Sequence, residues 1–191
     1  MLKKLCLTAC CLGSLLLTGC LSMSPMTPIK EWNGRFSLIA QNDQHKENHT
    51  GRFSLMQTAD QIQIFDLKTA LGNTLARIEL SVDEVRVQAI GQKEVVGQDP
   101  EALMTQLLGF SVPIHGLAFW IDGDTIPNVE ATTNPAQAPY DAIQQMGWVI
   151  SYRHLDETGL PRRIIFERKQ TSLAPALKIS LIILERRHGT P

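Results

Sequence analysis

The stretch Arg52–Leu80, RFSLMQTADQIQIFDLKTALGNTLARIEL, contains three runs in which apolar and polar residues alternate. The apolar members are Phe53 and Leu55, then Ile62 and Ile64, then Ala76, Ile78 and Leu80. Alternation with a period of two is typical of a strand that has one face against the core and the other in water. Short polar connections favour antiparallel neighbours. The stretch therefore predicts three strands of an antiparallel meander.

The same alternation continues on both sides of this stretch. Upstream, Trp32, Gly34, Phe36, Leu38 and Ala40 fall on one face of a predicted strand, and a polar turn over residues 41–51 follows it. Downstream, Val85, Val87 and Ala89 form a fifth run. Further runs at 148–152, 164–166 and 177–183 predict strands toward the C-terminus, and we interpret residues 142–147 as a strand rather than a helical turn.

Two helices are predicted between these groups of strands. Asp99 is a good N-cap, Pro100 suits the first turn, and Gly109 is a good C-terminal stop. Leu103, Leu107 and Leu108 form the apolar stripe of this helix. A second short helix is predicted over residues 115–122, and residues 122–139 are expected to be mostly loop because they contain three prolines and several small polar residues.

These elements define a fold class. We expect an α+β, mainly β protein, in which a curved antiparallel sheet forms a half-open barrel and a few short helices cover its open side. Such a barrel either encloses a hydrophobic cavity or packs solid, and the pattern of residues leaves both alternatives open.

The first residues predict export and lipidation. Residues 1–19 combine a basic start with an apolar run that is too short for a comfortable membrane span, as in a signal peptide. The run ends in Leu17-Thr18-Gly19-Cys20, which matches the bacterial lipobox; the alternative is an ordinary secretory peptide that happens to contain a cysteine. We expect a tether over residues 20–30 and a single domain over residues 31–191.

The cysteine count agrees with lipid attachment at Cys20. The other three cysteines, Cys6, Cys10 and Cys11, fall in the removed segment, so the mature chain keeps a single thiol. A covalent diacylglycerol with an N-acyl chain on Cys20 accounts for that thiol, and we expect no other cofactor. No Asp follows Cys20, which predicts transfer to the outer membrane, where the protein would face the periplasm.

The composition excludes some classes of function. Without Lys3 and Lys4 the chain has 16 basic and 19 acidic residues, and it has no basic stripe of the kind that binds nucleic acid. His45 and His49 have a metal-like spacing but lie in a predicted polar turn. We find no nucleophile, nucleotide or metal motif and expect a binding protein rather than an enzyme. The pairs Arg162-Arg163 and Arg186-Arg187 suit anionic headgroups or a partner, or are simply exposed strand ends.

Three segments together resemble a known family. They are EWNGRFSL at 31–38, the stretch at 52–80 quoted above, and DPEALMTQLLGFSVPIHGLAFWIDG at 99–123. The pattern resembles the LolB family of outer-membrane lipoproteins over nearly the whole mature chain. The family's loop commonly reads Asn-Pro-Leu-Gly, whereas this chain has Thr69-Ala70-Leu71-Gly72. The Asn-Pro pair is therefore absent, but the leucine is present.

The resemblance implies a function. Family members accept acylated lipoproteins from a soluble periplasmic carrier, LolA, and insert them into the outer membrane without nucleotide. It implies a hydrophobic cavity beneath a helical lid, a monomer with no nucleic-acid partner, and a membrane-insertion role for Leu71. The alternatives for Leu71 are that it folds back onto the domain or is an ordinary exposed leucine.

The apolar faces supply candidates for contact with acyl chains. Each is more often plain core than a ligand contact, and a structural or adaptor lipoprotein with a solid-packed core remains the alternative function. The candidates are Phe36, Leu38, Phe53, Leu55, Ile62, Ile64, Ile78, Leu80, Val85 and Val87 from the strands, with Leu103, Leu107, Leu117 and Trp120 from the helical region.

Overall fold

The computed structural model describes residues 28–134, 142–172 and 174–189. The predicted signal peptide, Cys20 and most of the predicted tether lie outside these residues. The first strand begins at Pro28, so the sheet takes in the last three residues that we assigned to the tether.

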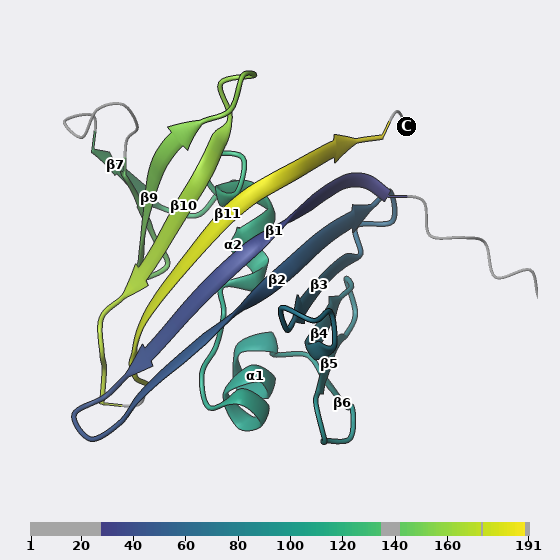
Figure 1. Ribbon diagram of the computed structural model, residues 1–191, viewed down its shortest axis with the longest axis vertical. Helices are drawn as coiled ribbons and strands as arrows, with labels where there is room; N and C mark the ends of the chain where they lie inside the picture. The colour runs from purple at the N-terminus through teal and green to yellow at the C-terminus, as the bar shows by residue number, and fades with distance from the viewer. Residues whose placement is uncertain (1–27, 135–141, 173, 190–191) are drawn as a thin grey trace, which may run out of the picture.

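The described residues form one 11-stranded antiparallel sheet, with the order β6-β5-β4-β3-β2-β1-β11-β10-β9-β8-β7. This linear order leaves β6 and β7 as the two edges. Figure 1 shows β1, β2 and β11 crossing the curved sheet as long strands, with both helices on one side of it. The strands are β1 (Pro28–Gln41), β2 (Lys46–Thr58), β3 (Gln63–Lys68), β4 (Thr74–Leu80), β5 (Val85–Ala89), β6 (Val95–Gly97), β7 (Ala131–Asn134), β8 (Ala142–Gln145), β9 (Trp148–Leu155), β10 (Pro161–Arg168) and β11 (Ala176–His188).

The sheet consists of two meanders that meet in its middle. One runs from β1 to β6 and the other from β7 to β11, and β1 pairs with β11 along most of its length. At the bulge beside Asn33, a Cβ added to Gly34 would lie 2.1 Å from the Ile182 carbonyl oxygen. Only glycine allows this approach of the two central strands. The predicted mainly β fold with an unclosed, curved antiparallel sheet is thus confirmed.

The predicted face of β3 is wrong. Ile62 still belongs to the turn before the strand, where its N–H donates to the Thr58 hydroxyl and Gln61 has a φ of 61°. The strand therefore starts one residue later than the alternation indicated. Phe65 stands opposite Leu55 and Ile78, whereas Ile64 stands opposite Met56 and Glu79. Phe65 and Leu67 thus take the positions toward the concave face that we assigned to Ile62 and Ile64, although Ile64 is itself buried, at 3% exposed.

Two helices, α1 (Pro100–Leu108) and α2 (Ile114–Trp120), lie against the concave face. The predicted caps of α1 are confirmed: the Asp99 side chain accepts from the N–H groups of Glu101 and Ala102, and Gly109 has a φ of 78°. Within the described part of the chain, neither helix is long and apolar enough to cross a membrane.

Three smaller differences separate the prediction from the structure. The short strands β6 and β7 were not predicted, and β7 lies in the segment that we expected to be mostly loop. The first polar turn is also shorter than expected, because β2 begins at Lys46. His49 consequently lies in a strand, opposite Leu38.

Candidate functional site

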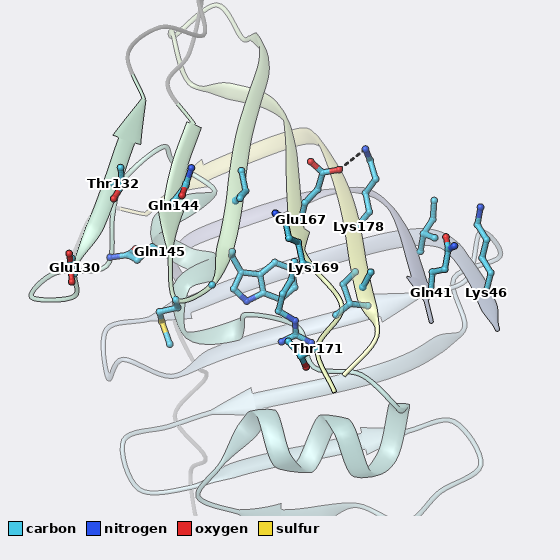
Figure 2. Close-up of a pocket in the computed structure, with 18 residues that line it drawn as sticks. Gln41, Lys46, Glu130, Thr132, Gln144, Gln145, Glu167, Lys169, Thr171 and Lys178 are labelled. Carbon is cyan, nitrogen blue, oxygen red and sulfur yellow. Dashed lines mark hydrogen bonds and ion pairs between the residues drawn. The ribbon is translucent and has the colours of Figure 1, made fainter. Parts of the chain in front are cut away.

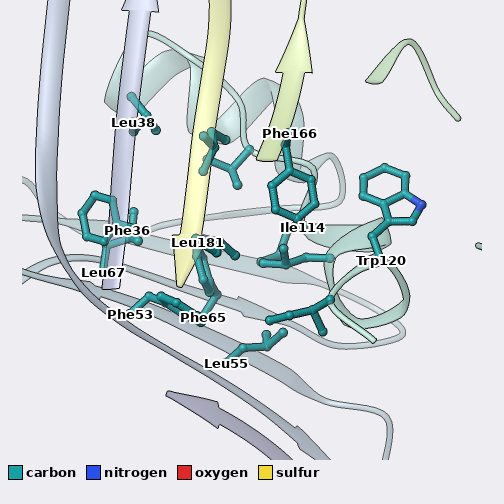
Figure 3. Close-up of a cluster of buried hydrophobic side chains, with 14 of the residues drawn as sticks. Phe36, Leu38, Phe53, Leu55, Phe65, Leu67, Ile114, Trp120, Phe166 and Leu181 are labelled. Carbon is teal, nitrogen blue, oxygen red and sulfur yellow. The ribbon is translucent and has the colours of Figure 1, made fainter. Parts of the chain in front are cut away.

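The concave face of the sheet carries one continuous cluster of buried apolar side chains, and α1 and α2 rest directly on it (Figure 3). Leu103 and Leu107 of α1 are partly buried against this cluster. Ten of the fourteen candidate residues are buried within it: Phe36, Leu38, Phe53, Leu55, Ile78, Leu80, Val85, Val87, Leu117 and Trp120.

The cluster also contains residues that the sequence reasoning left out. Phe65 and Leu67 take the places assigned to Ile62 and Ile64, neither of which belongs to the cluster. The signal was present, because Ile64-Phe65-Asp66-Leu67 has apolar residues in both phases of a two-residue period. From the helical region, Met104 and Ile114 are as deeply buried as Trp120.

Trp120 fixes the end of α2 to the sheet. Its indole N–H donates to Gln145 Oε1 of β8 at 2.8 Å, and its ring lies 6.3 Å from that of Phe166. The Gln145 amide also donates to the carbonyls of Ile126 and Val129. A buried polar side chain is therefore satisfied, and the helix and the following loop are held on the same strand.

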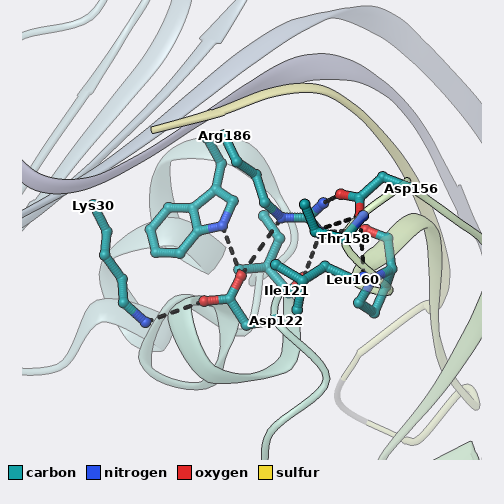
Figure 4. A network of polar contacts seen from close by, with 9 residues as sticks. Lys30, Ile121, Asp122, Asp156, Thr158, Leu160 and Arg186 are labelled. Atoms are coloured by element: carbon teal, nitrogen blue, oxygen red, sulfur yellow. Dashed lines mark hydrogen bonds and ion pairs between the residues drawn. The ribbon is translucent and has the colours of Figure 1, made fainter. Parts of the chain in front are cut away.

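A group of charged residues ties the same end of α2 to the centre of the sheet (Figure 4). Asp122 accepts from Trp32 Nε1 at 2.9 Å and from Lys30 Nζ at 3.1 Å, both on β1. Arg186 of β11 lies 3.6 Å from Asp122 and donates to Asp156 at 2.6 Å. We call Lys30, Trp32, Asp122, Asp156 and Arg186 the Asp122 cluster.

The Asp122 cluster corrects one interpretation of the sequence. Arg186 was expected in an exposed basic pair, but its side chain is only 9% exposed, and it also donates to the carbonyls of Ile121 and Pro161. Its neighbour Arg187 is exposed and pairs with Glu185. The pKa of Asp156 lies below its ordinary value, chiefly because the Thr158 hydroxyl donates to the carboxylate, with further contributions from backbone N–H groups and Arg186.

Leu71 is 91% exposed at the tip of the connection between β3 and β4. Residues 69–73, the Leu71 loop, are closed by their own hydrogen bonds: Thr69 N–H donates to the Asn73 carbonyl at 2.8 Å, and Gly72 N–H donates to the Thr69 carbonyl at 3.0 Å. Gly72 has a φ of 93°, which favours glycine. The loop is therefore shaped without the Asn-Pro pair, and the alternative that Leu71 folds back onto the domain is wrong.

An open pocket of about 1110 Å³ lies beside the ends of β9, β10 and β11 (Figure 2). Trp148 and Arg168 contribute to its wall, with the Arg168 guanidinium 4.9 Å from the centre of the Trp148 ring. Arg168 also donates to the Ser111 hydroxyl at 3.1 Å, and its burial lowers the pKa of the guanidinium. None of the fourteen candidate residues lines this pocket.

The histidines singled out in the sequence pair with a carboxylate. His45 and His49 each contact Glu47, at 3.0 Å and 3.2 Å, and the hydrogen bond from His49 makes the largest contribution to lowering the pKa of Glu47. Among residues 28–134, 142–172 and 174–189, no group of three or more His, Cys, Asp or Glu side chains has the arrangement of a metal site.

These features define a class of protein, a mainly β domain whose curved sheet carries an apolar concave face covered by helices. The family model described as "Outer membrane lipoprotein LolB" matches residues 30–185, and the chain belongs to this family. The predicted family and the predicted place at the outer membrane are thereby confirmed. The family's description is that of an outer-membrane lipoprotein, and it names no enzymatic activity.

Relatives named "Outer-membrane lipoprotein LolB" match most of the chain. The protein from Cupriavidus metallidurans is 27% identical over 88% of this chain and 91% of its own length. The protein from Ralstonia nicotianae is 28% identical over 75% of this chain and 74% of its own. A crystal structure of a LolA superfamily protein from Nitrosomonas europaea aligns at 10% identity with a TM-score of 0.45, covering 86% of this chain and 89% of that one.

Proposed function

We propose that this protein accepts acylated lipoproteins from a LolA-like periplasmic carrier and inserts them into the outer membrane without catalysis. Acyl chains on Cys20 anchor it there. The observation that carries the proposal is Leu71, a large apolar side chain held 91% exposed by a loop with its own hydrogen bonds. Membership of the LolB family supports the same role.

In this proposal, the cluster beneath α1 and α2 receives the acyl chains of the cargo. Burial of each methylene stabilises the bound chain by about 0.8 kcal/mol. In this structure α1 and α2 already cover these apolar side chains. A chain that enters replaces a helix as the cover, so one apolar contact is exchanged for another. The free energies of the protein with and without cargo are then similar. A receptor that must also release its cargo requires this.

The Leu71 loop performs the release step. An exposed leucine beside a lipid surface enters the acyl region at little cost, because it loses contact with water there. It thereby brings the apolar face of the domain close to the bilayer that receives the cargo. No nucleotide or cofactor takes part in this step.

One observation favours a second function, that of a non-catalytic structural or adaptor lipoprotein. The helices contact the cluster directly, and the open pocket of about 1110 Å³ is lined by other residues. A core that stays packed in this way would hold no acyl chain. The two functions differ in whether the protein takes cargo at all.

A two-step transfer assay tests the proposal. The LolA-like carrier is loaded with an acylated lipoprotein, the full-length protein is added, and cargo is followed first to the protein and then to liposomes. We expect Leu71→Glu to accept cargo as the wild type does and to lose most of its delivery, because a carboxylate cannot enter the bilayer cheaply. The matched control is Val82→Glu, at another exposed apolar side chain in the turn between β4 and β5.

The outcomes separate the two functions. Equal delivery by wild type and Leu71→Glu would make Leu71 an ordinary surface leucine. Equal losses in Leu71→Glu and Val82→Glu would show that any added charge is harmful, with no special role for the loop. If the wild type accepts no cargo, the adaptor function is the better account.

A further inference from the structure

The convex face of the sheet carries a row of cations in direct register. Arg35 of β1 stands opposite Arg52 of β2, and Arg52 stands opposite Lys68 of β3. Residues opposite one another in an antiparallel pair point to the same face, and the neighbouring side chains Phe36, Phe53 and Leu67 are buried in the concave cluster. On the other side of Arg35, the row continues through Ile182 of β11 to Arg163 of β10.

The positive charges of the two central arginines in this row are not neutralised by the described acidic side chains. Among the described residues, neither Arg35 nor Arg52 has a carboxylate within ion-pair distance. Lys68 lies 3.9 Å from Asp66, which also approaches Arg77 at 3.7 Å. Like charges directly opposite one another destabilise a sheet. Arg35 and Arg52 therefore oppose folding in the free protein, and an anionic partner would remove that cost.

The row borders the Leu71 loop. Arg35, Arg52 and Lys68 line a groove of about 560 Å³ together with Gly72 of the loop and Leu184 of β11. Leu184 is 57% exposed, and Ile182 beside it is also exposed. Glu185 lines the groove too, but Arg187 holds it at 2.7 Å. Unpaired arginines thus lie next to exposed aliphatic side chains, at the base of the loop that presents Leu71.

We propose that the groove formed by Arg35, Arg52 and Lys68 binds the phosphate groups of anionic phospholipids. The guanidinium forks suit phosphate oxygens, and exposed aliphatic side chains beside cations suit the boundary between headgroups and acyl chains. This inference rests on the proposed membrane role of the Leu71 loop. Cations at the headgroup level would hold the loop in a fixed orientation, with Leu71 directed into the leaflet.

A membrane accounts for this surface better than an acidic protein partner does. A protein that recognised two arginines would not need the exposed aliphatic side chains of Leu184 and Leu71 on either side of them, whereas a lipid leaflet offers charge and apolar contact in adjacent layers. The chain as a whole has a formal net charge of −1, so attraction to an anionic surface has to come from a local feature of this kind.

Photo-crosslinking measures this contact directly. A photoreactive phenylalanine analogue replaces Leu184 in the full-length protein, which is reconstituted into vesicles of phosphatidylcholine alone or of phosphatidylcholine with phosphatidylglycerol. Lipid adducts are then quantified by mass spectrometry. We expect severalfold more adduct when phosphatidylglycerol is present, and a decrease in that excess when salt is added.

Charge variants assign the contact to the arginines. Arg35→Gln/Arg52→Gln should remove most of the phosphatidylglycerol-dependent adduct, whereas Lys93→Gln/Lys169→Gln, which removes two exposed charges elsewhere, should keep it. Arg35→Lys/Arg52→Lys should retain a large part of it, because lysine also attracts phosphate. If the glutamine variant keeps the phosphatidylglycerol-dependent adduct, the charge of the arginines is not responsible and the proposal is wrong.

Other outcomes overturn the inference and leave the proposed function standing. Equal adduct in the two kinds of vesicle, or equal adduct in both glutamine variants, rules out headgroup recognition, as would adducts formed with protein instead of lipid. The transfer assay on the same preparations reports separately on Leu71. Normal delivery by Leu71→Glu together with arginine-dependent adducts would leave the headgroup site standing without the insertion role.

Discussion

The Leu71 loop and the Asp122 cluster adjoin the same sheet but differ in which kind of side chain they expose to water. The loop presents an apolar side chain to water and is held by hydrogen bonds among its own five residues. The Asp122 cluster withdraws charges from water and joins α2 to β1, β11 and the turn before β10. One region depends on nothing outside itself, whereas the other depends on segments far apart in the chain. Changes in the two regions should therefore separate function from stability.

The largest expected effect on stability comes from a substitution at the end of α2, which the Asp122 cluster holds against the sheet. Trp120→Ala removes a fully buried side chain, together with the hydrogen bond to Gln145. We expect a loss of about 3–5 kcal/mol in the free energy of unfolding. Urea denaturation followed by circular dichroism measures it. A loss below about 1 kcal/mol would mean that α2 lies loosely on the sheet and that the concave face is easily opened.

Asp122→Ala should have the next largest effect. It leaves Arg186, Lys30 and the Trp32 indole N–H without this partner, although Asp156 still holds Arg186 and Lys30 reaches water. We expect a loss of about 2–3 kcal/mol in the same denaturation measurement. Asp124→Ala, at an exposed carboxylate two residues away, is the control and should change little. Equal effects of the two substitutions would contradict the role given to the Asp122 cluster.

A smaller effect should appear at acid pH. Because the folded-state pKa of Asp156 is lowered, its contribution is fully present above its unfolded pKa, about 3.9, and is lost as pH falls through the folded value. The contribution should be below about 1 kcal/mol, since the side chain is partly exposed. Denaturation of wild type and Asp156→Asn as a function of pH should give stabilities that differ at neutral pH and converge at acid pH. A difference that stays constant would assign the effect to packing.

The smallest effect on stability should come from the position with the largest effect on delivery. Leu71→Glu changes an exposed side chain that takes no part in the hydrogen bonds of its loop, so we expect a change within about 0.5 kcal/mol. Thermal unfolding of the protein used in the transfer assay provides the measurement. A large loss of stability would mean that failed delivery reflects unfolding instead of a missing apolar contact.

Much of the sheet could be predicted because its signal is local. In β1, the residues from Trp32 to Ala40 face the side that their polarity indicates, with the exception of Ile39, which lies on the outward face. In β3, both phases of Ile64-Phe65-Asp66-Leu67 contain apolar residues and all four are buried, so the length of the preceding turn decides which of them face the concave cluster. No count of apolar residues within the strand reveals that length.

The site divides in the same way. The location of Leu71 in a short connection between two strands could be predicted from the neighbouring residues, and so could the caps of α1. The burial of Arg186 could not, because its partners Asp122 and Asp156 are distant in sequence and meet it only through the order of the strands. The cation row was missed for the same reason, since Arg35, Arg52 and Lys68 align only once the register of three strands is known.

The pairing of β1 with β11 has a consequence for how the chain folds. The first and last strands of the domain are neighbours at the centre of the sheet, with Lys30 opposite His188. The middle of the structure therefore cannot close until the C-terminal residues are available, and closing it joins the two most distant parts of the domain. Contacts of such high order slow folding. We therefore expect the pairing that completes the centre of the sheet to be among the last to form, because it needs strands from both ends of the described domain.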